Sequence, residues 1–230
     1  MKKLIARNRY FFIPYFLFLI GSIVLLLVFN KPELHIIFNK ISTPAFDAFF
    51  RRITYLGDGL IYLLLLAILL FYNFRWTIVF TGAVIVSNML VYIGKHLLFP
   101  NAYRPGKYFE QFESYQLHIV NGVKMHGFHS FPSGHTCTAF TVFVMLALLV
   151  RNNSLKFLCF AVALLTGFSR VYLSQHFLID IVVGSAIGCG SIVMAWLYFN
   201  SFSLPWFNES LSFKRRIQPK TKVSKVVPES

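Results

Sequence analysis

Six apolar runs dominate this 230-residue chain and leave few folds open to it. Hydrophobic residues make up 57% of the sequence and charged residues only 13%, a balance that soluble domains rarely carry. Inside a bilayer the backbone groups of a span must bond within the protein, so a run of about 20 apolar residues is expected to be a helix. We therefore predict an all-α polytopic membrane protein, with six transmembrane helices in a bundle at about residues 11–29, 57–73, 77–99, 135–150, 155–173 and 177–199.

Three of these runs differ from a simple transmembrane helix. The runs at 57–73 and 135–150 hold uninterrupted apolar stretches shorter than the roughly 20 residues of a typical span, so their helices must borrow flanking polar positions. The run at 11–29 follows a basic N-terminus and would also suit a cleaved signal peptide. Its apolar stretch is long and it lacks an A-x-A-like cleavage site, which favours a retained anchor.

Basic residues set the expected orientation. With the N-terminus inside, the cytoplasmic segments hold 13 of the 22 Lys and Arg residues, as the positive-inside rule requires. We predict a multi-pass protein of the bacterial inner (cytoplasmic) membrane with both termini cytoplasmic. Topology therefore explains the net charge of +14 better than a nucleic-acid partner does. We expect one membrane domain over residues 1–210 and a basic, disordered tail over 211–230 that is attracted to anionic lipid.

Two outer segments connect the spans. Residues 30–56 mix aromatic with charged positions and predict an amphipathic helix lying on the outer side. The loop at 100–131 is rich in aromatic residues and too long for a turn, so we expect it to cover a site or to meet lipid headgroups. The three cysteines, Cys137, Cys159 and Cys189, lie within predicted spans without metal-ligand spacing, and we interpret them as structural thiols.

Three polar clusters interrupt this apolar pattern, and the predicted topology places all of them on the outer face. Scattered core polar residues would have no reason to share one face. The clusters are Lys95 with Arg104-Pro105, then Pro132-Ser133-Gly134-His135, then Ser169-Arg170 followed by His176 and Asp180.

The second cluster stands at the start of a predicted helix. Ser133 has the position of an ordinary N-cap, which would explain it without any chemistry. Gly134 would also let backbone N–H groups approach an anion at the helix N-terminus. His135 then stands where it can donate a proton to a leaving oxygen.

The third cluster is more specific, because Arg and Asp near membrane depth are costly and mark either function or a buried pair. His176 and Asp180 are four residues apart, so a helix starting near His176 would place them on one face. The carboxylate would then orient the imidazole and leave its other nitrogen free to attack. The alternative is a structural ion pair between Arg170 and Asp180.

The first cluster would be weak alone, since a lysine at the end of a span commonly extends to the interface. We include it in the site because the predicted topology places it on the same face as the other two clusters. Arg104 offers a planar fork for phosphate oxygens and Lys95 a point charge.

In this order the clusters resemble the three-part signature of the type 2 phosphatidic acid phosphatase superfamily, whose membrane members are six-helix lipid phosphate phosphatases. The second and third parts match residue for residue. In the first part, eight residues separate Lys95 from Arg104, more than the family pattern usually has. A shifted helix end or the nearby Lys107 could fill the lysine position.

The resemblance implies a mechanism without metal or cofactor, and the sequence offers no carboxylate cluster to hold Mg²⁺. His176 would form a phosphohistidine, oriented by Asp180, and His135 would protonate the leaving group and then activate water. Phosphoryl oxygens would be held by the remaining motif residues, which are Lys95, Arg104, Ser133, Gly134 and Arg170.

The sequence leaves the substrate and some other functions open. Undecaprenyl diphosphate or lipid A phosphate is favoured, with phosphatidylglycerol phosphate or phosphatidic acid as alternatives. A transporter would tend to place polar residues at the midplane rather than at one edge. A vanadate-dependent haloperoxidase shares the signature but is soluble, and a non-catalytic lipid-phosphate binder also remains open, as does the oligomeric state.

Overall fold

The structure, a computed structural model, describes residues 1–211, and its regular elements in that range are all helices. The predicted tail at 211–230 lies almost wholly outside the described residues. The longer helices are α1 (Lys2–Arg7), α2 (Arg9–Val28), α3 (Lys31–Asn39), α4 (Pro44–Ile53), α5 (Gly59–Tyr72), α6 (Phe74–Ile93), α7 (Pro105–Phe112), α8 (Gly134–Leu149), α9 (Asn153–Tyr172) and α10 (Leu178–Phe199). Three short helices complete the fold: η1 (Thr54–Gly57), the π-helical η2 (Gly94–Leu98) and η3 (Pro205–Asn208).

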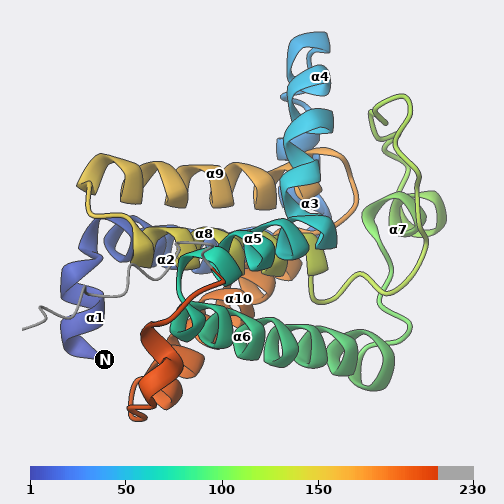
Figure 1. Ribbon diagram of the computed structural model, residues 1–230. Helices are drawn as coiled ribbons and strands as arrows, with labels where there is room; N and C mark the ends of the chain where they lie inside the picture. The colour runs from blue at the N-terminus through green and yellow to red at the C-terminus, as the bar shows by residue number, and fades with distance from the viewer. Residues whose placement is uncertain (212–230) are drawn as a thin grey trace, which may run out of the picture.

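Helix α8 lies inside a bundle formed with α2, α5, α6, α9 and α10 (Figure 1). Ten of its 16 residues are buried, including Phe140 and Met145. Two glycines of α10 allow the close approach: a Cβ at Gly184 would lie 2.5 Å from the Ser133 carbonyl oxygen, and one at Gly188 would lie 2.6 Å from that of Cys137. Small residues at such spacing are how membrane helices gain van der Waals contact.

Four helices are long and apolar enough to cross a membrane: α2, α6 extended through η2, α9 and α10. A fifth span results if α4–η1 and α5, which meet at a 53° bend, are counted together. Six spans are therefore not confirmed, although the all-α membrane bundle is. Helix α8 has only 16 residues, or about 24 Å, against a hydrocarbon core of about 30 Å. Because α8 is enclosed by other helices, its length need not match the bilayer.

The bundle has two distinct ends. Lys156 Nζ, near the start of α9, donates to the carbonyl of Arg7 at 2.8 Å. The backbone N–H of Phe74, at the start of α6, donates to the carbonyl of Glu209 at 2.8 Å. The N-terminus and the chain around Glu209 thus lie at one end, while α7 lies at the other (Figure 1).

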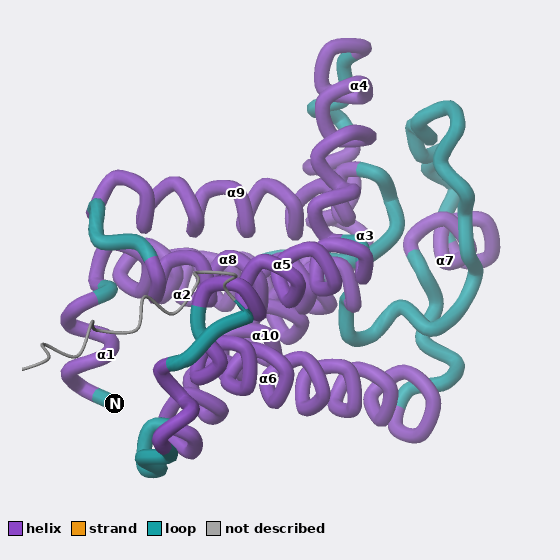
Figure 2. Tube along the Cα trace, in the orientation of Figure 1, coloured by secondary structure: helices purple, strands orange, loops and turns teal. Residues whose placement is uncertain are grey.

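The segment at 30–56 differs from the single amphipathic helix that we expected. It forms two helices, α3 and α4, because Thr43 caps a new helix at Pro44. Helix α4 stands away from the bundle (Figure 2). It is still tied to the bundle, since the Tyr172 hydroxyl donates to Asp47 Oδ1 at 2.6 Å.

The long segment after η2 holds helix α7, followed by loop from Glu113 to Ser133 (Figure 2). Its position is secured at two points. The backbone N–H of His118 donates to Asn39 Oδ1 at 2.9 Å, and Asn39 Nδ2 donates to the His118 carbonyl at 3.0 Å. Arg51 Nη1 donates to the Asn121 carbonyl at 3.2 Å. Helices α3 and α4 therefore hold this loop over the end of the bundle.

Candidate active site

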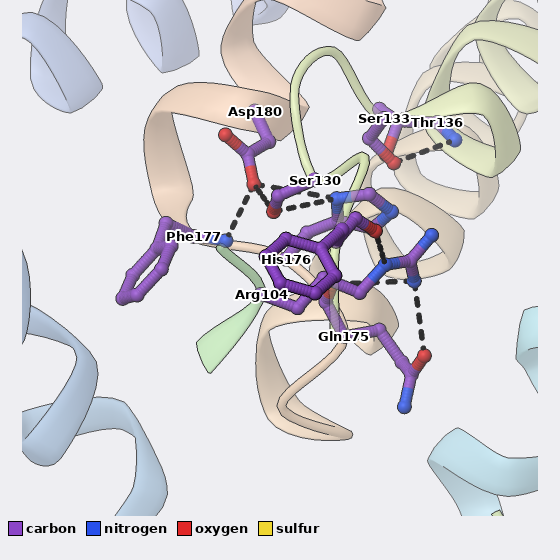
Figure 3. A network of polar contacts seen from close by, with 9 residues as sticks. Arg104, Ser130, Ser133, Thr136, Gln175, His176, Phe177 and Asp180 are labelled. Carbon is purple, nitrogen blue, oxygen red and sulfur yellow. Dashed lines mark hydrogen bonds and ion pairs between the residues drawn. The ribbon is translucent and has the colours of Figure 1, made fainter. Parts of the chain in front are cut away.

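The third cluster forms a buried histidine–carboxylate pair (Figure 3). His176 Nδ1 lies 3.3 Å from Asp180 Oδ2, and the two residues are 1% and 2% exposed. Our expectation of one shared helix face is wrong, because α10 begins at Leu178 and His176 lies in the preceding loop. The bond forms because Asp180, in the first turn of α10, points back toward that loop.

Two further donors hold the Asp180 carboxylate. Ser130 Oγ donates to Asp180 Oδ2 at 2.5 Å, and the backbone N–H of Phe177 donates to the same atom at 3.0 Å. Three donors around one oxygen fix the carboxylate without a cation. Asp180 is thereby oriented toward the Nδ1 side of the His176 ring.

His176 is electrostatically suited to attack an electrophile. Burial lowers the pKa of His176 to about 3, against the opposing effect of its hydrogen bond with Asp180. The imidazole is therefore neutral at pH 7. With Nδ1 engaged by the carboxylate, Nε2 keeps its lone pair. This is the state that a nitrogen nucleophile requires.

Ser133 of the second cluster caps α8, as the simpler interpretation expected. Its hydroxyl oxygen accepts from the Thr136 N–H at 3.4 Å and from the Thr136 hydroxyl at 2.9 Å. Its own backbone N–H donates to the Asp180 carbonyl at 3.0 Å. The start of α8 is thus fixed against the start of α10, which brings the second cluster to the third.

Lys95 of the first cluster also reaches this point. It lies in η2, and a Cβ built at Gly134 would be 3.9 Å from Lys95 Nζ. Lys95 thus stands in a π-helical turn that follows α6. Lys107 instead pairs with Glu110 at 3.0 Å on α7. Lys95 is therefore the lysine beside the start of α8.

Arg104 contacts the loop that carries His176 (Figure 3). Its Nη1 donates to Gln175 Oε1 at 3.1 Å, and its Nε donates to the Phe128 carbonyl at 3.0 Å. Arg104 is buried, with no carboxylate within ion-pair distance among the described residues.

Arg170 is buried as well and lacks the partner that the structural alternative required. Its Nη1 donates to Thr54 Oγ1 at 2.8 Å, whereas its Nε is buried without a hydrogen-bond partner. Residues 1–211 contain no ion pair between Arg170 and Asp180. A buried guanidinium with an unused donor is costly unless an anion completes it.

His135 faces the junction between the predicted connector at 30–56 and the predicted span at 57–73, a segment to which sequence reasoning gave no role in the site. Its Nε2 lies 3.7 Å from Asp58 Oδ1, and both side chains are partly exposed. Gly57 packs so closely on His135 that a Cβ there would lie 2.7 Å from the His135 carbonyl oxygen. With Thr54 on Arg170, residues 54–58 form a fourth contributor to the site. The Gly57-Asp58 pair just before an apolar run was its only sequence signal.

Sequence reasoning also missed Ser130 and Gln175, which hold Asp180 and Arg104. Both are direct neighbours of the motifs, two residues before Pro132 and one before His176. Their position next to a motif was the one feature of the sequence that could have indicated these two residues.

Taken together, the eight predicted site residues meet at the end of the bundle that carries α7. Two histidines there adjoin three cations, which suits binding an anionic group and transferring it. Among the described residues, no group of three or more His, Cys, Asp or Glu side chains is placed to hold a metal ion.

Known lipid phosphatases are similar to this chain in sequence. The chain is 26% identical to a lipid A 4'-phosphatase from Porphyromonas gingivalis over 164 residues, which covers 68% of this chain and 67% of that protein. It is 37% identical to the undecaprenyl-diphosphatase BcrC of Bacillus subtilis over 70 residues. That match covers 30% of this chain and about a third, 34%, of BcrC.

Two solved structures share the fold. The crystal structure of Aquifex aeolicus LpxE superposes with a TM-score of 0.63 at 28% identity, covering 72% of this chain and 94% of LpxE. A PAP2-type phosphatidylglycerolphosphate phosphatase from Bacillus subtilis gives a TM-score of 0.58 at 21% identity, covering 88% of this chain and 98% of that one, and shows the fold alone.

The family model of the PAP2 superfamily matches residues 76–203, which include all three polar clusters. Because this match spans more than half of the 230 residues, the chain belongs to the PAP2 superfamily.

Proposed function

We propose that this protein is an integral-membrane lipid phosphatase that hydrolyses a phosphate monoester or diphosphate through a phosphohistidine intermediate. One observation carries the proposal: neutral, oriented His176 lies among cations that have no carboxylate partner within residues 1–211. Arg170 even keeps a buried, unbonded Nε. Family membership and the names of the relatives support a phosphatase.

The reaction follows from these positions. His176 Nε2 attacks phosphorus while the bond from phosphorus to the leaving oxygen breaks, and His135 gives that oxygen a proton. His135 then takes a proton from water, whose oxygen attacks the phosphohistidine and frees His176 and inorganic phosphate. Lys95, Arg104 and Arg170 hold the phosphoryl oxygens and stabilise the charge of the transition state, with Ser133 and the Gly134 N–H at the helix start. No step requires a metal ion or cofactor.

We further propose that six helices cross the membrane and that the site faces the periplasm of a bacterial inner membrane. Helices α2, α5, α6, α8, α9 and α10 each run between the two ends of the bundle. Arg7, Arg75 and Lys156 lie at the end away from the site, as the positive-inside rule expects of cytoplasmic segments. Both termini would then be cytoplasmic.

The substrate candidates are lipids with an exposed phosphate. Undecaprenyl diphosphate and lipid A phosphate match the names of the two relatives, and phosphatidylglycerol phosphate and phosphatidic acid remain alternatives.

The test is phosphate release by the purified protein in detergent over these four lipids, with EDTA present. We expect release from at least one lipid, and losses of about 10³-fold or more in kcat for His176→Ala and for His135→Ala. No release from any lipid would refute the proposal. Loss of activity in EDTA that Mg²⁺ restores would refute a metal-independent reaction.

A second measurement tests the intermediate. Incubation with a lipid carrying a radiolabelled phosphate, followed by alkaline denaturation, should leave label on the protein. His135→Ala should retain label and His176→Ala should not. Label on His176→Ala would refute the assignment of the nucleophile.

A further inference from the structure

Asp58 lies beside the second histidine of the site, at the start of α5. Its Oδ1 is 3.7 Å from His135 Nε2, which is too long for a hydrogen bond but within the range of an ion pair once the ring is protonated. Gly57 brings this part of the chain close, because its backbone packs directly on that of His135. Within residues 1–211, Asp58 is the one carboxylate at ion-pair distance from His135, as Asp180 is for His176.

The Asp58 side chain is not used by its own helix. Aspartate is among the residues that most often cap a helix, because its carboxylate accepts a backbone N–H of the first turn. Asp58 has the N-cap position of α5, and its backbone carbonyl accepts from the Ile61 N–H at 3.1 Å, yet its carboxylate makes no capping bond. The carboxylate is therefore available to His135.

The charges around His135 give such a carboxylate a role. To protonate a leaving oxygen, the ring must first hold two protons and a positive charge. Positive charge from Lys95, Arg104 and Arg170 acts on this ring, and like charges disfavour its protonated form. A carboxylate at ion-pair distance offsets part of that repulsion.

We propose that Asp58 is a positioning residue for His135, which holds the Nε2–H and stabilises the imidazolium that acts as general acid. The proposal rests on the proposed phosphatase function and deepens it. In the first step, His135 Nδ1 gives its proton to the leaving oxygen as the bond from phosphorus to that oxygen breaks, and the ring becomes neutral. In the second step, Nδ1 takes a proton from the attacking water and the imidazolium forms again. Asp58 stays ionised throughout, as the carboxylate of a serine-protease triad does.

The site then has two histidine–carboxylate pairs with different roles. Asp180 is 2% exposed and is held by Ser130 and by the Phe177 N–H, which suits the orientation of a neutral nucleophile. The Asp58 side chain is 46% exposed, so solvent weakens its interaction with His135. Loss of Asp58 should therefore cost less activity than loss of Asp180.

The experiment uses the leaving group to separate proton donation from other effects. The full-length protein in detergent receives the lipid that the wild type hydrolyses best, and the same lipid with sulfur in place of the oxygen that links phosphorus to the leaving group. Sulfur leaves without a proton more readily than oxygen does, because S–H groups are far more acidic than the corresponding O–H groups. The measured quantity is kcat/KM, which depends only on the steps up to departure of the leaving group.

Asp58→Asn and Asp58→Ser both remove the charge and keep a residue that caps helices, so α5 should stay intact. Glu110→Gln is the matched control, because it removes a carboxylate from the same end of the bundle whose partner is Lys107. We expect both Asp58 variants to lower kcat/KM about tenfold for the oxygen compound and less than about twofold for the sulfur analogue. Glu110→Gln should match the wild type on both substrates.

Three results would overturn the proposal. Equal losses on both substrates would mean that Asp58 acts on phosphate binding, through its electrostatic interaction with Arg170. An unchanged kcat/KM for the oxygen compound would show that His135 needs no carboxylate, and an equal loss in Glu110→Gln would show an effect of net charge alone. Failure of the phosphatase function itself is distinct, because the wild type would then release phosphate from no lipid.

Discussion

A single methyl group at residue 57 should displace His135 and slow the reaction. A Cβ there would lie 2.7 Å from the His135 carbonyl oxygen, 2.9 Å from its Cβ and 3.1 Å from its carbonyl carbon. Unstrained carbon contacts need roughly 3.5 Å or more, so the two backbones must separate by about 0.5–1 Å. Since a misplacement of about 1 Å can cost roughly 10²-fold, Gly57→Ala should lower kcat by about 10–100-fold.

The matched control is Gly59→Ala, two residues along, where a new Cβ meets nothing within 4 Å. Initial rates of phosphate release at saturating lipid give kcat, and thermal unfolding in detergent reports the strain, for which overpacking suggests about 1–3 kcal/mol. Gly59→Ala should keep wild-type activity and stability. If Gly57→Ala matches Gly59→Ala in kcat, residues 54–58 do not position His135 and the reasoning is refuted.

Three other predictions concern Asp180, Arg170 and His35. Asp180→Asn should lower kcat by about 10³-fold, because a neutral amide orients the imidazole poorly. Ser130→Ala should lower kcat only about tenfold. Equal kcat values for the two variants would contradict the role of the Asp180 charge. Arg170→Lys should lower kcat/KM by about 10–100-fold by removing the planar fork, whereas wild-type phosphate release would show that charge alone suffices. Burial lowers the pKa of His35 to about 4, so the folded state binds fewer protons than the unfolded state between about pH 4 and 6.5, and stability should fall by up to about 2 kcal/mol on going from pH 7.5 to 5. Thermal unfolding should show a smaller acid-induced drop for His35→Gln, and an equal drop would contradict the assignment.

The sequence predicted the helical bundle well because the apolar runs are long and local. It was less reliable where length is set by neighbours: α5 and α8 have 14 and 16 residues, since helices enclosed in a bundle need not match the bilayer. It also merged α3 and α4 into one amphipathic helix, although Thr43-Pro44 is a recognisable start signal.

The motif residues were predicted together because each cluster stands at the same end of an apolar run. Their supporting residues were not. Thr54 and Arg170 are 116 positions apart, and Ser130 and Asp180 are 50 apart. No short pattern connects such pairs, so their contact was unpredictable from spacing alone.

The sequence by itself therefore determined the all-α membrane class and the position of the three clusters at one end of the bundle, since each depends on residues within one turn or one run. Tertiary structure alone decided which groups touch, as with Asp58 beside His135 and Thr54 on Arg170. These contacts depend on how closely α8 and α10 approach, which Gly184 and Gly188 permit, and on how residues 54–58 and 113–127 are held over that end. Such packing sums many weak distant contacts, which no local stretch of sequence encodes.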